Sequence, residues 1–211
     1  SHTAMVELSG VIAEGTDASA STVNELLNKA FKDRHSKGVI LKINSPGGTP
    51  VQAAQINAEI TRLREKYPDK PMHVVISDLC ASGGYYVAAA ADSIYAAEAS
   101  MVGSIGVRLD SFGVMDAMNK LGIERRTITS GEHKALLDPF APQSEEQRTH
   151  LQTMLDDVHQ LFIDAVKSGR GDRLSDDPDI FTGLVWSGKQ AKDLGLIDEF
   201  GDEHYVSREV I

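Results

Sequence analysis

The sequence predicts an α/β fold with a largely parallel sheet and flanking helices. Short apolar runs rich in Val and Ile alternate with longer stretches in which apolar residues recur at helical spacing. Turns rich in Gly, Pro and Ser separate them, a pattern typical of βαβ units. With 211 residues, 41% of them hydrophobic, the chain can bury a sizeable core. No fixed-period repeat or low-complexity linker interrupts it, so we predict one domain over residues 1–211.

The first half reads as alternating strands and helices. The predicted elements are a strand over 6–12, a helix over 21–31 capped by Ser21 or Thr22, a strand over 39–43 and a long helix over 50–67. A buried strand over 73–76 then leads through a turn at Ser82 into a helix. This order places two glycine-rich turns, at 44–50 and 81–86, directly after two strands.

The second half mixes short strands with one long helix. We predict a strand over 92–96, a strand or bend over 102–107, a short helix over 112–118, and a strand over 123–128 from its alternation. Ser144 and Gln147 form a capping-box pattern that opens a helix reaching residue 166. Ser187 caps a last helix over 188–194, and strand-like residues follow, including the pair at 205–206.

Charge and cysteine content exclude several classes of protein. The formal net charge is −10 and no dense Lys/Arg block occurs, which argues against nucleic acid as a partner. Cys80 is the single cysteine, so no intrachain disulfide can form, and we expect it to be a buried packing residue. The seven histidines show no HExxH-like spacing, so no metal or other cofactor is predicted.

The ends of the chain suggest a fragment of a longer protein. It begins at Ser1 without a methionine, and no apolar run approaches the roughly 18 residues of a membrane helix. We therefore expect a soluble piece of a membrane-anchored protein whose anchor lies outside this chain.

Ser82 is the candidate nucleophile. It stands between a strand and a helix and is followed by Gly83 and Gly84. A helix N-cap is the commoner role of such a serine, but a cap does not require two glycines, each costing about 1 kcal/mol relative to alanine in a helix. Glycines there allow another segment to approach the backbone closely. The nucleophile elbow of α/β-hydrolases is not matched, because position 80 is Cys rather than Gly.

A second glycine turn, Gly47-Gly48, follows the strand over 39–43. The carboxyl ends of neighbouring parallel strands lie at the same edge of a sheet, so the two turns can face each other. One backbone N–H from Gly47 or Gly48 and another from Gly83 could then hold an oxyanion, and each such donor contributes about 3 kcal/mol to transition-state stabilisation.

These two motifs together carry a family resemblance. The segments at 44–48 and 81–86, with those at 101–107, 130–134 and 188–198, resemble the signal peptide peptidase A family over residues 4–209. The resemblance implies a crotonase- or Clp-protease-like fold of repeated ββα units and a serine protease with a Ser/Lys dyad. Some members carry two tandem copies and split the dyad between them, whereas this chain holds one copy with both residues.

The resemblance implies roles for three side chains. Ser82 would be the nucleophile, Lys134 the general base, and Ser104 a hydroxyl that orients the lysine. An amine acts as a base near neutral pH only when burial favours its uncharged form. The apolar residues that follow Lys134 suggest such a setting. His133 would supply the histidine of a less favoured Ser-His-Asp alternative.

The resemblance also implies a substrate and a setting. We expect cleavage of hydrophobic peptides such as remnant signal peptides, without a cofactor, on the extracytoplasmic (periplasmic) side of a bacterial membrane. A homo-oligomer, an octamer or a tetramer, is expected. Two alternatives remain: a crotonase-type acyl-CoA enzyme, and a non-catalytic assembly domain of the same fold.

Overall fold

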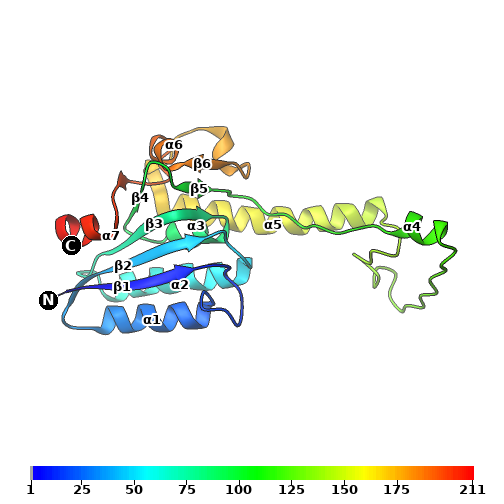
Figure 1. Cartoon of the computed structure of the whole chain (residues 1–211), viewed down its shortest axis with the longest axis horizontal. Coiled ribbons are helices and arrows are strands. Elements are labelled where there is room, and N and C mark those ends of the chain that lie inside the picture. Colours follow the sequence, from blue (N-terminus) through cyan, green and yellow to red (C-terminus); the bar gives the residue numbers. More distant parts are fainter. Residues whose placement is uncertain (1) are drawn as a thin grey trace. The chain divides into compact units, whose positions relative to one another are not determined.

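A computed structural model describes residues 2–211 of the chain and contains one mixed sheet of seven strands (Figure 1). Its path runs β1-β2-β3-β4-β7, and β5 pairs with both β3 and β6. Every pairing is parallel except β5 with β6. The strands are β1 (His2–Ser9), β2 (Ser36–Ser45), β3 (Met72–Ala81), β4 (Ser93–Ala96), β5 (Met101–Gly103), β6 (Val185–Ser187) and β7 (Glu199–Phe200). The predicted α/β fold with a largely parallel sheet is confirmed.

The helices connect these strands in the order the sequence predicts. They are α1 (Ala20–Lys32), α2 (Pro50–Lys66), α3 (Gly83–Ala88), α4 (Met115–Lys120), α5 (Glu145–Arg170), α6 (Gly188–Asp193) and α7 (Glu203–Tyr205). Short helical turns follow at η1 (Gly171–Arg173), η2 (Pro178–Phe181) and η3 (Val206–Val210). No helix among the described residues combines the length and apolar character needed to cross a bilayer.

The chain divides into two compact units. The first comprises residues 1–106 and 161–211 and holds the whole sheet; the second comprises residues 107–160. Helix α5 supplies residues to both. The prediction of a single domain over 1–211 stays a prediction.

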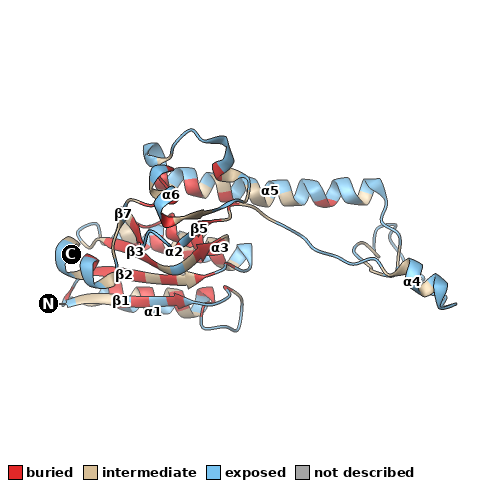
Figure 2. Cartoon of the chain, turned by 45° about the horizontal axis from the view of Figure 1, so that its top comes forward, coloured by how far each residue is buried: buried red, intermediate tan, exposed pale blue. Residues whose placement is uncertain are grey.

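The core of the first unit follows from the alternation of its strands. Along β2, Val39, Leu41 and Ile43 face the large apolar cluster that also contains residues of α1, α2 and α3. Ile40 points to the other face, where it packs with Val75, Tyr95 and Val206 of the C-terminal segment. Figure 2 shows the buried positions gathered on the strands and on one side of α1. Both sheet faces are therefore covered, as expected for parallel strands.

The second unit has almost no core of its own. Within residues 107–160, all of which are described, Leu151 is the only buried hydrophobic residue. Phe112, Leu121 and Ile128 are 82%, 74% and 99% exposed. Figure 2 shows α4 and the loops around it largely without buried positions.

Several local predictions are corrected. Residues 123–128 are not a strand: no neighbouring strand supplies a hydrogen-bonding partner, and a strand is not stable without one. The residues at 205–206 are helical rather than strand-like. Helix α1 is capped by Ser19, not by Ser21 or Thr22. Of the strand or bend predicted over 102–107, only residues 102–103 are strand, as part of β5.

Other local predictions are confirmed. The capping box of α5 forms, because the Gln147 N–H donates to Ser144 Oγ (3.1 Å) and the Ser144 N–H donates to Gln147 Oε1 (3.2 Å). Ser187 caps α6 in the same way. Cys80 is fully buried, and burial raises the pKa of its thiol, as expected of a packing residue.

Candidate active site

Ser82 occupies a strained turn between β3 and α3. Its φ of 52° and ψ of −123° lie outside the regions that residues with a side chain normally adopt. It stands at the N-cap position, yet its hydroxyl makes no capping hydrogen bond. The simple reading of Ser82 as an N-cap is therefore wrong. Such strain costs on the order of 1–3 kcal/mol and persists where the surrounding structure enforces it.

Strand β5 holds this turn in place and brings a second serine beside it. The Ser82 N–H donates to the Gly103 carbonyl (2.8 Å), which extends the parallel pairing of Ala81 with Gly103. The next residue, Ser104, also has a positive φ, 54°, and its N–H donates to the Leu184 carbonyl (2.8 Å). Of the three non-glycine residues with positive φ in the described part of the chain, two are therefore the serines identified from the sequence.

The two glycine turns lie in contact, as the sequence predicts. A methyl group placed on Gly47 would lie 2.7 Å from the Gly83 amide nitrogen and 2.9 Å from Ser82 Cβ. One placed on Gly83 would lie 3.3 Å from the Gly48 nitrogen. Gly47 also has φ 99°, which favours glycine. The structure thus brings Gly47, Gly48, Gly83 and Ser82 together.

Hydrogen bonding distinguishes Gly47 from Gly48. The Gly47 N–H donates to Ser45 Oγ (3.1 Å) and is already used. The Gly47 carbonyl accepts from the Ile12 N–H (2.9 Å). Because a trans peptide group is planar, its N–H points away from its carbonyl, so the Gly48 N–H is directed away from Ile12. The Gly48 and Gly83 amides have no partner among the hydrogen bonds of the described residues.

The residues around Ser82 fill other roles. Tyr85 is fully buried, its hydroxyl donates to the Leu196 carbonyl (2.6 Å), and burial raises its pKa. The Asn57 side-chain amide donates to the Tyr86 carbonyl (2.7 Å), and the Tyr86 ring packs on Phe162. Both tyrosines are therefore packing residues.

Lys134 belongs to the second unit, whereas Ser82 and Ser104 belong to the first. Its backbone N–H donates to the Gly131 carbonyl (3.1 Å), and its side chain is exposed in this chain. The burial expected from the following apolar residues is not provided here. His133 lies 3.7 Å from Glu146 and 3.4 Å from the Gln147 side-chain amide, so its described partners are on α5. The pairing of Ser82 with Lys134 stays a prediction.

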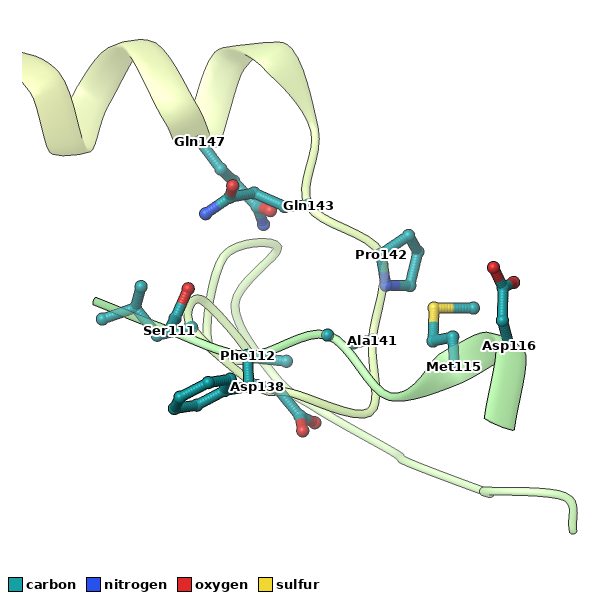
Figure 3. A pocket seen from close by; sticks show the side chains of 12 residues that line it. Ser111, Phe112, Met115, Asp116, Asp138, Ala141, Pro142, Gln143 and Gln147 are labelled. Atoms are coloured by element: carbon teal, nitrogen blue, oxygen red, sulfur yellow. The ribbon is translucent and has the colours of Figure 1, made fainter. Parts of the chain in front are cut away.

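The second unit contains a cavity of about 330 Å³ (Figure 3). Phe112 and Met115 come from the segment that opens α4, and Gln143 and Gln147 lie at the start of α5. Ala135 lines the same cavity and immediately follows Lys134 in the chain.

Ligand-type side chains gather at one further place. Single ligand atoms of Glu132, His133 and Glu146 lie within 4.8 Å of one another, and all three residues are exposed. The spacing of these three residues in the sequence does not predict the cluster, because Glu146 comes from a different segment from the other two.

Fold and geometry together define a class: an α/β protein with a largely parallel sheet and a serine-hydrolase type of site at its edge. The comparisons give the family. Residues 64–210 match the sequence profile of Peptidase family S49, so the chain belongs to this family of serine proteases.

Similar proteins include annotated proteases. The chain is 39% identical over 178 residues to a putative protease of Methanocaldococcus jannaschii, covering 84% of this chain and 56% of that protein. It is 33% identical over 175 residues to a putative signal peptide peptidase SppA of Enterococcus faecium, covering 83% and 50%. It is 44% identical over 204 residues to a protein of Brucella melitensis named Na(+)/H(+) antiporter NhaA, covering 94% of this chain and 27% of that one. The chain thus spans about half or less of these relatives.

Proposed function

We propose that this chain hydrolyses peptide bonds through an acyl-enzyme on Ser82, with Lys134 as the general base. The Ser82 hydroxyl oxygen attacks the peptide carbonyl carbon while the lysine amine accepts the hydroxyl proton. The same proton then passes to the leaving amine as the C–N bond breaks, leaving an ester on Ser82. A water molecule hydrolyses that ester, and no cofactor takes part.

The observation that carries the proposal is the strained Ser82 beside two unused amides. The Gly48 N–H and the Gly83 N–H would donate to the oxyanion of the tetrahedral intermediate. Gly47 is not proposed as a donor, because Ser45 already accepts its N–H. Ser104, which follows the carbonyl that holds Ser82, would orient the lysine amine.

Assembly would complete the site. Lys134 is exposed in this chain, and the unit that carries it exposes Phe112, Leu121 and Ile128. Large apolar side chains that face water are candidates for burial against a partner. We propose that further copies of the chain cover it in a ring of eight or four, and that this contact excludes water from the lysine.

The proposed substrates are hydrophobic peptides, including remnants of signal peptides. The support is family membership together with a relative named signal peptide peptidase SppA. The proposed location is the extracytoplasmic side of a bacterial membrane, reached through an anchor outside this chain.

Four measurements test the mechanism. Ser82→Ala and Lys134→Ala should each lower turnover of an unfolded protein by about 10³-fold or more, and Lys120→Ala, an exposed lysine on α4, is the matched control. A fluorophosphonate should label Ser82 in the parent protein.

Activity should rise with pH between 6 and 9, because an amine base must lose its proton. Full activity in the Lys134 variant, or binding of acyl-CoA esters without labelling of Ser82, would refute the proposal.

A further inference from the structure

Ser45, the last residue of β2, makes two hydrogen bonds beside the glycine turn. Its side chain is buried, with 1% of the residue exposed. Its hydroxyl donates to the Gly10 carbonyl (2.6 Å) and accepts the Gly47 N–H (3.1 Å). One hydroxyl therefore joins the segment after β1 to the turn that carries Gly48.

Ser45 lies at the end of β2, next to the candidate site. The pairing of β2 with β3 shifts after Ile43, and Ser45 then pairs with Cys80, two residues before Ser82. A methyl group placed on Gly84 would lie 3.1 Å from the Ser45 carbonyl oxygen and 3.5 Å from its Cβ. Ser45 thus touches both the turn with Gly48 and the start of the helix with Gly83.

The turn needs such a restraint. Glycine can adopt more φ and ψ angles than other residues, and Gly47 and Gly48 are adjacent, so the backbone of this turn changes conformation easily unless it is held. Rotation of the peptide between them would turn the Gly48 N–H away from Gly83. Two bonds hold the two ends of Gly47: the Ile12 N–H binds the carbonyl of the Gly47–Gly48 peptide, and Ser45 Oγ accepts the N–H of the preceding Pro46–Gly47 peptide. The second is the one made by a side chain, so substitution can remove it.

We propose that Ser45 is a positioning residue for catalysis: its hydroxyl holds the Pro46–Gly47 peptide, and through it the backbone of the turn, so that the Gly48 N–H faces the oxyanion together with the Gly83 N–H. This inference rests on the proposed function, since it assumes that these amides hold the oxyanion. Ser45 itself does not touch the substrate. Its effect is confined to the transition state, where the oxyanion exists.

The chain offers a matched control. Ser100 is also buried, with 2% exposed, and its hydroxyl donates to the Ser77 carbonyl (2.6 Å) and accepts the Ala97 N–H (3.1 Å). It has the same pattern of bonds at the same distances, but it joins segments that do not carry the two amides. Ser100→Ala therefore removes the same two kinds of hydrogen bond from a buried site, and we expect it to leave the Gly48 and Gly83 amides in place.

The experiment compares Ser45→Ala, Ser45→Cys and Ser100→Ala in hydrolysis of a fluorogenic hydrophobic peptide and in inhibition by the corresponding peptide aldehyde. Ser45→Ala should lower kcat by about 10-fold or more with KM nearly unchanged, and should weaken aldehyde binding by the same factor, because the aldehyde adduct carries the oxyanion. Ser45→Cys preserves the shape of the side chain and offers a weak hydrogen-bonding group, so its kcat should be intermediate. Ser100→Ala should retain the parent kcat.

Two results would overturn the inference, and neither depends on the Ala variant alone. One is equal kcat in Ser45→Ala and Ser100→Ala. The other is a Ser45→Cys variant with the kcat and the aldehyde affinity of the parent protein, together with a folded Ser45→Ala variant that is as active as the parent. A parallel Ser82→Ala measurement separates the two proposals: an inactive Ser82 variant with active Ser45 variants refutes only the role of Ser45, whereas an active Ser82 variant refutes the proposed function.

Discussion

The two units of this chain differ in how far their side chains are buried. In the first, strands and helices enclose a continuous apolar core, and even a guanidinium is fully buried with its partners in place. In the second, one hydrophobic residue is buried and large apolar side chains face water. Ser82 and both proposed oxyanion donors lie in the first unit, and Lys134 lies in the second. The proposed nucleophile therefore lies in a well-packed unit of one chain, whereas the proposed base is exposed in this chain and, under the proposed function, depends on a further copy to bury it.

Two arginines show the contrast most directly. Arg170 is buried and donates to both Asp198 carboxylate oxygens (2.9 and 3.0 Å) and to the Gly195 carbonyl (2.9 Å). Burial alone would raise the pKa of Asp198, but the hydrogen bonds from Arg170 and the Ile94 N–H outweigh it and hold that pKa below its usual value. Arg126, by comparison, pairs with Glu124 (2.9 Å) in the second unit while its side chain remains 82% exposed.

The largest predicted effect is on this pair of arginines. Arg170→Met should lower the free energy of unfolding by about 3 kcal/mol or more, because it leaves the Asp198 carboxylate half-buried without its main partner. Arg126→Met in the second unit should cost much less, because Arg126 and its partner Glu124 are both largely exposed and water screens the pair. Urea unfolding followed by circular dichroism measures both. Equal losses would contradict the contrast between the units.

A second prediction compares two glycines. A methyl group on Gly48 would lie 1.9 Å from the Ile12 carbonyl oxygen, so Gly48→Ala should cost about 3 kcal/mol through backbone displacement. Gly113 in the second unit has no atom within 4 Å of that position, and Gly113→Ala should change stability by less than about 0.5 kcal/mol. The midpoint of thermal unfolding compares the two variants. A Gly48 variant as stable as the parent protein would show that Gly48 and Ile12 are less closely packed than described.

A third prediction concerns pH. Burial lowers the pKa of His73, while the nearby Asp92 and Asp198 oppose this shift and Arg64 adds to it, so folding favours the neutral imidazole. The unfolded chain then binds more protons below its ordinary pKa of about 6.5, and stability falls as the pH drops below that value. Urea unfolding at pH 7 and at pH 5 should therefore show a lower free energy of unfolding at pH 5.

His73→Phe should remove this part of the pH dependence, because phenylalanine preserves the ring packing against Tyr95 and does not titrate. His150→Gln, at an exposed position of the second unit, is the control and should leave the slope of stability against pH as in the parent protein. An unchanged slope in His73→Phe would exclude His73 as its source.

The smallest predicted effect on protomer stability is in the exposed apolar residues. Phe112→Ser together with Ile128→Ser should change the free energy of unfolding by less than about 0.5 kcal/mol, because neither side chain is buried in this chain. The same double variant should shift the oligomer toward smaller species in sedimentation velocity, if further copies cover these residues. An unchanged oligomer would place the proposed contact elsewhere.

Much of the fold and part of the site could be predicted from the sequence. The alternation in β2 and β3, the capping box at Ser144 and the contact of the two glycine turns all follow from local periodicity and from the common edge of parallel strands. The sequence could not show that residues 123–128 are not a strand, because alternation gives no information on whether a partner strand exists.

Sequence by itself determined the order of the elements, the two glycine turns and the serine that stands between β3 and α3, since each depends on neighbouring residues. Tertiary structure decided which turn amide is used and which is free, because Ser45 bonds the first and Ile12, from a segment some thirty-five residues away, fixes the peptide of the second. It also decided that Lys134 is exposed in this chain. The physical reason is that a backbone amide carries the same chemistry at every position, and its role is set only by the atoms that folding brings opposite it.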